Sequence, residues 1–268
     1  SEIENFNIFG GLALAGITGI VVIGGLKRIA EVATFLVPLM GSIYFGAMLI
    51  ALILNLDLVL PAFKLILVDA FNGTAVAGGT FFGVLIYGVR RGAFSNEAGM
   101  GTESLVHGVA KVSNPVKQGL VAMTGPIFDT LIICTATALM ILVSGVWETS
   151  SSQGVTLTAE AFSILLGNFG GLILFTCVIC FGLSTIFTYS YYGASCSRFL
   201  FGNFGMKFYI YLYIFSIFIY SIVPIDIAIN IADGAFALMA IPTLISALWL
   251  APKVMQASKN YFKLVDNI

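Results

Sequence analysis

Charged residues are scarce in this chain. Of its 268 residues only 9% are Asp, Glu, Lys or Arg, whereas 59% are hydrophobic, and the mean hydropathy is +1.04. Water-soluble domains have about 25% charged residues, because their surface must face water. The composition therefore excludes a water-soluble globule. The length is sufficient for a bundle of seven membrane spans of about 20 residues each.

Histidine, cysteine and clustered basic residues are also rare. The net charge is −1 and no basic run occurs, so we do not expect a nucleic-acid partner. His107 is the single histidine, and a metal centre would need histidine or carboxylate ligands beside the cysteines. We expect Cys134, Cys177, Cys180 and Cys196 to pack as small apolar residues, without a metal cofactor. We also find no set of residues typical of a catalytic site, so an enzyme is not expected.

Seven stretches have the length of a membrane span, and one of them is irregular. The six regular stretches are Ile8–Leu26, Phe35–Leu56, Gly119–Val143, Gly167–Tyr192, Phe208–Val223 and Ala228–Leu250. The irregular one, Ala77–Gly108, contains charges. A short amphipathic helix at the membrane surface is expected over Pro61–Phe71. These features predict an all-α membrane protein.

The basic residues alternate along the chain in a way that predicts a topology. Lysine and arginine accumulate in the cytoplasmic connections of membrane proteins. Nine of the 12 basic residues fall in every second connection: Lys27, Arg28, Lys111, Lys117, Arg198, Lys207, Lys253, Lys259 and Lys263. We therefore expect a multi-pass protein of the cell membrane, with the N-terminus of this chain outside and its C-terminus in the cytoplasm.

The irregular span is polar where it should cross the membrane. Residues 88–104 include two arginines, two glutamates, an asparagine and several glycines. Such charges face a bundle interior or a water-filled cavity. We predict a broken helix, with helical halves over Ala77–Gly92 and Thr102–Val112 and a non-helical stretch over Phe94–Gly101. The alternatives are a re-entrant or surface loop with a different span count, and glycines that serve helix packing alone.

The polar run also carries a resemblance. The sequence Arg91-Gly-Ala-Phe-Ser-Asn-Glu-Ala-Gly-Met-Gly-Thr102 resembles the signature of the sodium:alanine (amino acid:cation, AGCS) symporter family. Further matches follow the family's order and cover nearly the whole chain: Val37–Met40, Tyr44, Pro115–Leu120, Asp129–Thr135 and Tyr191–Gly193.

The resemblance implies a secondary active transporter with the LeuT-like fold of two inverted five-helix repeats. On that fold the chain is similar to core helices four to ten. The first three core helices, including the other broken helix, have no counterpart here. Residues 1–268 are thus expected to form part of a single transmembrane transporter domain, the C-terminal part, which should not transport without the missing helices.

The resemblance places a small neutral amino acid, such as alanine or glycine, at the break. Carbonyls at the end of the first half-helix would accept from its ammonium group. Amides at the start of the second half-helix would bind its carboxylate, assisted by the helix dipole. The expected substrate-binding residues are Phe94, Asn96, Gly99, Met100, Gly101, Thr102, Thr185 and Tyr189.

A second cluster is expected to bind sodium as the coupling ion. Phe181, Ser184 and Thr185 share one helix face and offer two hydroxyls and a carbonyl, and hard cations prefer oxygen ligands. The spacing resembles the sodium site on the eighth core helix of LeuT-like transporters, whose other ligands would come from a missing helix. The alternative is that these hydroxyls bond to their own backbone.

Four charged residues remain as gating or ion-pair candidates: Arg90, Arg91, Glu97 and Asp129. Asp129 lies in the middle of a span, where it would pair with an arginine or a missing helix, or relay a proton or cation. With His107, it leaves open a proton-coupled amino acid transporter. A seven-span receptor would instead have unbroken spans, and a channel would conduct ions without substrate.

Overall fold

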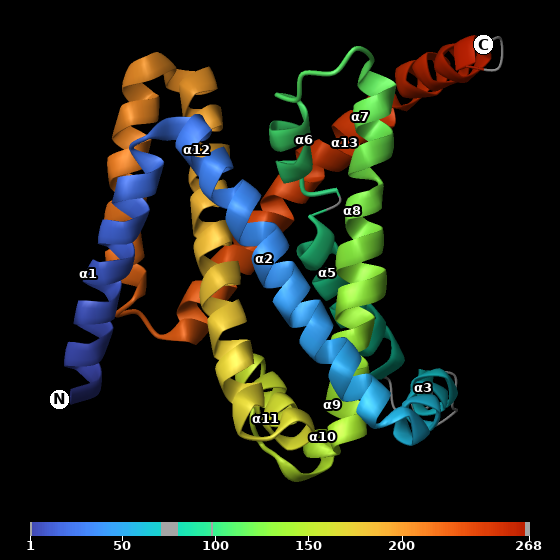
Figure 1. The fold of residues 1–268 in the computed structure, drawn as a ribbon. Helices are drawn as coiled ribbons and strands as arrows, with labels where there is room; N and C mark the ends of the chain where they lie inside the picture. The colour runs from blue at the N-terminus through green and yellow to red at the C-terminus, as the bar shows by residue number, and fades with distance from the viewer. Residues whose placement is uncertain (1, 71–79, 98, 266–268) are drawn as a thin grey trace. The chain divides into compact units, whose positions relative to one another are not determined.

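The computed structural model describes residues 2–70, 80–97 and 99–265, and within these ranges every regular element is a helix (Figure 1). This confirms the expected all-α class. The helices are α1 (Glu2–Val22), α2 (Gly25–Leu54), α3 (Leu56–Ala70), α5 (Thr80–Asn96), α6 (Thr102–His107), α7 (Pro115–Ala122), α8 (Thr124–Pro126), the π-helix η1 (Ile127–Cys134), α9 (Thr135–Ser144), α10 (Val146–Thr149), α11 (Val155–Leu166), α12 (Asn168–Tyr220) and α13 (Ile225–Val265).

Four helical segments among the described residues are long and apolar enough to cross a membrane. They are Gly25–Leu54, Pro115–Ser144, Asn168–Tyr220 and Ile227–Leu264. The third has 53 residues and contains Gly202, whose φ of 68° and ψ of −159° are not helical. This glycine separates two of the predicted spans within α12. The count of seven spans and the LeuT-like arrangement remain predictions.

Several helix ends differ from the expectation. The predicted surface helix begins earlier, because α3 starts at Leu56, and it ends at Ala70. The last helix continues to Val265, so Lys253, Lys259 and Lys263 lie on α13 and not beyond it. The extension contains three lysines and two alanines, which are strong helix formers, and hydropathy alone does not detect such a polar continuation.

The chain divides into two compact units. Unit 1 comprises residues 1–29, 93–126 and 187–268, and unit 2 comprises residues 30–92 and 127–186. The expectation of a single transporter domain remains a prediction.

Unit 2 has its hydrophobic core around Tyr44 of α2. The Tyr44 ring stacks on Phe162 of α11 with centroids 5.5 Å apart and meets Phe181 of α12 edge-on at 5.6 Å. Met48 and Met140 are fully buried beside them. Because these residues come from four helices, the cluster joins α2, α9, α11 and α12.

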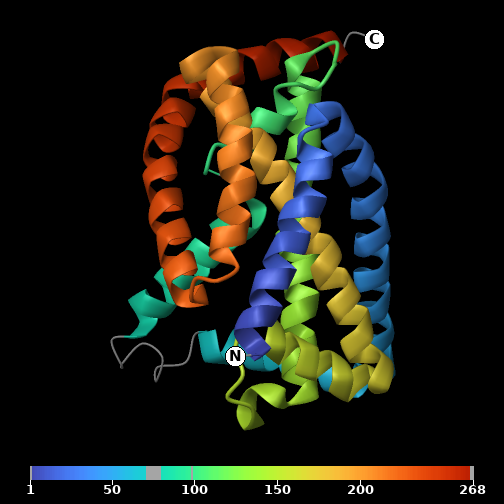
Figure 2. The same ribbon diagram turned by 90° about the vertical axis from the view of Figure 1, so that its left-hand side faces the viewer.

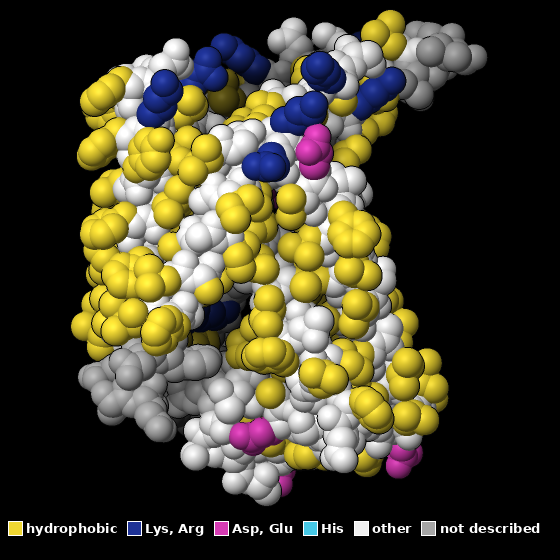
Figure 3. All heavy atoms as spheres, turned by 60° about the vertical axis from the view of Figure 1, so that its left-hand side comes forward, with side chains coloured by type: hydrophobic (Ala, Val, Ile, Leu, Met, Phe, Trp, Pro, Cys, Tyr) yellow, Lys and Arg dark blue, Asp and Glu magenta, His cyan; other side chains and the backbone are white. Residues whose placement is uncertain are grey.

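In unit 1 the connections that contain basic residues lie at one end. The α1–α2 turn, the α6–α7 connection, the bend of α12 and the end of α13 share this end, while the start of α1 and the α12–α13 turn lie at the other (Figures 1 and 2). On the face in Figure 3, hydrophobic side chains cover the helices, and Lys and Arg side chains gather near one end. This grouping agrees with the predicted alternation.

Candidate functional site

The predicted break is present and shorter than expected. Helix α5 continues to Asn96 and α6 begins at Thr102, so the expectation that residues 94–96 are non-helical was wrong. The second half-helix also ends at His107, before the predicted Val112. Each residue added to a helix gains a hydrogen bond to the preceding turn, so α5 continues past Phe94. It ends at Asn96, directly before the positive φ of Glu97.

Left-handed backbone angles mark the break. The φ angles are 55° at Glu97, 81° at Gly99 and 87° at Gly101. Glycine adopts such angles without steric cost. A residue with a Cβ atom rarely does, and Glu97 is the single described non-glycine residue with a positive φ. The Met100 amide donates to the Glu97 carbonyl at 3.1 Å, which closes a turn between the two helices.

The start of α6 contains a buried polar group. The Thr102 side chain is 1% exposed, and its hydroxyl has no hydrogen-bond partner among the described residues. Gly101 precedes it as the N-cap and supplies no side-chain cap. Because the first amides of a helix lack partners within the helix, this end can bind a carboxylate. Met100 is 6% exposed and lies beside it in the turn.

Glu97 contacts two tyrosines of α12. Its carboxylate accepts a hydrogen bond from the Tyr189 hydroxyl at 2.8 Å and one from the Tyr192 hydroxyl at 3.4 Å. Tyr189 was an expected site residue, whereas Tyr192 was missed, although it lies three residues further on the same helix face. An ion pair of Glu97 with an arginine remains a prediction. The guanidinium of Arg91, one of the two candidate arginines, lies 5.2 Å from the centre of the Tyr87 ring.

Two residues of α13 also border the break, and sequence reasoning missed both. The Phe236 ring meets Phe94 edge-on at 4.5 Å and Tyr189 at 6.2 Å. A Cβ atom on Gly101 would lie 2.6 Å from the Thr243 hydroxyl oxygen. No local pattern distinguishes these residues from the rest of an apolar helix, so only packing identifies them.

The expected sodium residues lie in unit 2. The Ser184 hydroxyl donates to the Phe181 carbonyl at 2.9 Å, so these two oxygens are adjacent. Ser184 is 9% exposed, and its hydroxyl also lies 3.9 Å from the Met40 sulfur. Thr185 is exposed. The Ser184 hydroxyl thus bonds to the backbone of its own helix, which was the alternative to sodium binding. A sodium site at these three residues remains a prediction. A role of Thr185 at the substrate site also remains a prediction.

Asp129 lies in the π-helix η1 of unit 2. The neighbouring Thr130 hydroxyl donates to its carboxylate at 3.3 Å. A π-helix is rare and often marks a functional position, because its wider turn displaces side chains from their α-helical places. The proposed ion pair or relay of Asp129 remains a prediction.

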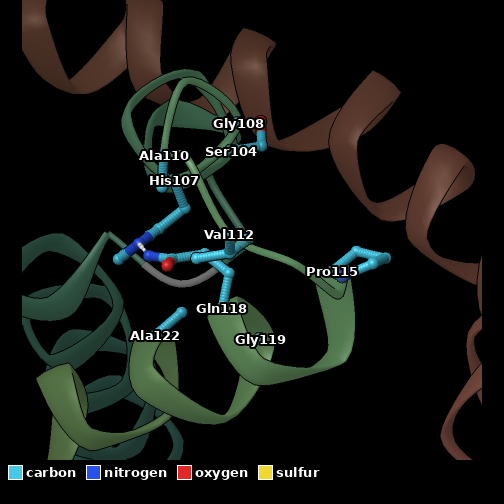
Figure 4. Close-up of a pocket in the computed structure, with 9 residues that line it drawn as sticks. All are labelled: Ser104, His107, Gly108, Ala110, Val112, Pro115, Gln118, Gly119 and Ala122. Atoms are coloured by element: carbon cyan, nitrogen blue, oxygen red, sulfur yellow. Dashed lines mark hydrogen bonds between the residues drawn. The ribbon is translucent and has the colours of Figure 1, made fainter. Parts of the chain in front are cut away.

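His107 lies beside a hollow between α6 and α7. Its Nδ1 atom is 2.7 Å from the side-chain nitrogen of Gln118, and the two side chains point toward one another (Figure 4). An amide nitrogen donates, so Nδ1 accepts and the proton of the neutral ring lies on Nε2. The hollow of about 400 Å³ is lined by Ser104, His107, Gly108, Ala110, Val112, Pro115, Gln118, Gly119 and Ala122. The histidine thus ties the end of α6 to α7.

Comparison with known proteins places the chain among transporters. The model of the sodium:alanine symporter family matches residues 2–267. The chain is 36% identical to the uncharacterized transporter YflA of Bacillus subtilis, with 98% of the chain and 57% of that protein covered. It is 35% identical to the sodium/alanine symporter AgcS of Methanococcus maripaludis, with 96% and 57% covered. It is 33% identical to the probable sodium/glutamine symporter GlnT of Bacillus subtilis, with 94% and 53% covered.

These matches and the long apolar helices indicate a multi-pass membrane protein. The chain spans little more than half the length of the relatives that it matches. It belongs to the sodium:alanine symporter family, which consists of transporters and not of enzymes.

Proposed function

We propose that the protein to which this chain belongs is a sodium-coupled symporter of a small neutral amino acid. The observation that carries the proposal is the break between α5 and α6. There the left-handed backbone lies beside the buried Thr102 hydroxyl, which has no hydrogen-bond partner in the part of the chain that the structure describes. Backbone amides and a hydroxyl at a helix start suit the carboxylate of a zwitterion. Family membership supports the transport class.

The substrate residues of the proposal lie around this break. The amides of Gly99, Gly101 and Thr102 bind the carboxylate, because the Met100 amide already donates to the Glu97 carbonyl. Carbonyls at the end of α5, with Asn96, accept from the ammonium group. Met100 and Phe94 limit the size of the side chain. Alanine and glycine, whose side chains are small, fit this proposed site best. Because one relative is named as a probable sodium/glutamine symporter, glutamine is the first competitor to test.

Sodium would bind at Phe181, Ser184 and Thr185, with further ligands from helices outside this chain. Its binding would raise the affinity for the amino acid, and the amino acid would raise the affinity for sodium by the same factor. Rocking of helices would then expose the site to the cytoplasm, with the basic end of unit 1 facing inward. No bond is made or broken, so the residues only bind and release.

Uptake by the complete gene product in proteoliposomes tests the proposal. We expect labelled alanine to accumulate under an inward sodium gradient, and excess unlabelled glycine or glutamine to report the substrate range. Replacing sodium with choline at constant pH should abolish accumulation. Accumulation that persists in choline and follows a proton gradient would contradict sodium coupling and favour the proton-coupled alternative, for which Asp129 and His107 are the candidates.

A further inference from the structure

A carboxylate and two phenol groups meet where the chain leaves α5. One Glu97 oxygen accepts from Tyr189 at 2.8 Å, and the other accepts from Tyr192 at 3.4 Å. The two rings lie on one face of α12, with centroids 5.3 Å apart. Hydrogen bonds to a carboxylate are stronger than those between neutral groups, and the shorter one should dominate.

The same residue has the unusual backbone. Glu97 has a φ of 55°, a sparsely populated angle for a residue with a Cβ atom. Such a conformation persists only when the surroundings hold it. Its own carbonyl accepts from the Met100 amide at 3.1 Å, so the side chain and the backbone of Glu97 are both held by hydrogen bonds.

We infer that Glu97 is a positioning residue of the transporter. Its carboxylate, held by Tyr189 and Tyr192, fixes the Glu97 backbone against α12, and the Met100 amide that donates to the Glu97 carbonyl is held with it. The amides and the Thr102 hydroxyl at the start of α6 are thereby held ready for a ligand. The inference rests on the proposed function for the identity of that ligand. The Tyr189 hydroxyl acts through Glu97 and not by direct contact with the amino acid.

Substitutions that remove the shared contact test this role. In Tyr189→Phe and Glu97→Gln of the complete protein, we expect the KM for the amino acid to rise about tenfold, because a hydrogen bond to a charged group is lost. The maximal rate should change less than about twofold, since a bound ligand restores the turn. The combined variant Glu97→Gln with Tyr189→Phe should raise the KM by less than the product of the two single effects, because both changes weaken the same contact. Tyr192→Phe should have a smaller effect.

Tyr191→Phe is the matched control. Tyr191 lies between the two tyrosines in sequence but lines a separate hollow with Val22 and Arg198. Its KM should equal that of the unsubstituted protein. Unchanged KM in both Tyr189→Phe and Glu97→Gln would overturn the inference. Additive losses, with Glu97→Gln far more damaging than Tyr189→Phe, would also overturn it, because Glu97 would then contact the ligand itself.

Hydrogen exchange gives a readout that does not depend on transport. In Tyr189→Phe with Tyr192→Phe, amides in the peptide that covers residues 97–102 should exchange about tenfold faster, because the turn opens more often. Tyr191→Phe should leave exchange unchanged, and so should the double variant if the inference is wrong. If the unsubstituted protein takes up no amino acid, the proposed function fails, whereas the exchange result still decides the positioning role.

Discussion

The Tyr44 and Thr137 hydroxyl oxygens lie 2.9 Å apart, although the residues are separated by 93 positions in the sequence. Thr137 donates its hydrogen to the Ile133 carbonyl at 2.8 Å, so Tyr44 is the donor in the pair. The bond joins α2 to the first turn of α9, and Ile133 lies at the end of the π-helix. A hydrogen bond thus links two helices within the apolar core of unit 2.

Tyr44→Phe should lower the stability of unit 2. The ring contacts with Phe162 and Phe181 remain, so only the hydrogen bond is lost, at a cost of about 1 kcal/mol. The melting temperature of the purified protein in detergent should fall accordingly. Phe162→Ala, which empties a fully buried position, should cost more, about 3–5 kcal/mol. Tyr211→Phe is the exposed control, and an equal shift in that control would contradict the prediction.

Gly101→Ala should impair transport. The residue has a φ of 87°, and a Cβ atom there would lie 2.6 Å from the Thr243 hydroxyl oxygen. The unfavourable backbone angle of an alanine there costs about 1 kcal/mol of stability. In addition, α13 or the turn must be displaced to make room for the Cβ atom. Uptake of labelled alanine should fall at least about tenfold.

Gly88→Ala serves as the control for that variant. Gly88 lies in α5, and a Cβ atom there meets no atom within 4 Å. Its uptake should remain unchanged. If the combined variant Gly101→Ala with Thr243→Ala partly recovers uptake, the recovered part is due to the close contact with Thr243, and the remaining loss is due to the backbone angle. Full activity of Gly101→Ala alone would refute the assignment of this turn to the substrate site.

Ser184→Ala with Thr185→Ala should weaken the sodium dependence of uptake. Removing two of the proposed oxygen ligands should raise the sodium concentration for half-maximal uptake by about tenfold. Ser216→Ala is the matched control, because its hydroxyl donates to a backbone carbonyl of the same helix, that of Tyr213 at 2.7 Å. Sodium activation that is identical in all three proteins would remove the ion-site assignment.

The pKa of Glu160 should respond to a serine hydroxyl. The Ser152 hydroxyl donates to the Glu160 carboxylate at 2.6 Å, and hydroxyls of Ser152 and Ser150 lower the pKa of Glu160 below its ordinary 4.5. Because the pKa of Glu160 is lower in the folded state, its hydrogen bonds stabilise the fold at pH values above the ordinary pKa of 4.5. This stabilisation is lost as the pH falls through the lowered pKa of the folded state.

Ser152→Ala should therefore raise the pKa of Glu160 toward 4.5, and carbon-13 NMR of the carboxyl group measures it directly. Ser151→Ala, at the exposed neighbouring position, is the control and should leave the pKa in place. Equal titration curves for the two variants would contradict the hydrogen bond as the cause.

Local patterns predicted the break at the correct place but not its length. The glycines at 99 and 101 and the polar run around Asn96 marked the interruption. Helix α5 nevertheless continues through Phe94 to Asn96, because a helix extends as long as each added residue gains a hydrogen bond. A sequence pattern shows where a helix must stop and does not show how many polar residues remain helical before that point.

The sequence alone determined the helical, membrane-embedded class, the family and the interrupted span, because hydropathy and glycine placement act over a few residues. Tertiary structure decided the partners of the site. Tyr192, Phe236 and Thr243 meet the break only because α12 and α13 pack against it in unit 1. Contacts between residues far apart in the sequence depend on how helices assemble, and apolar helices look alike in sequence on every face.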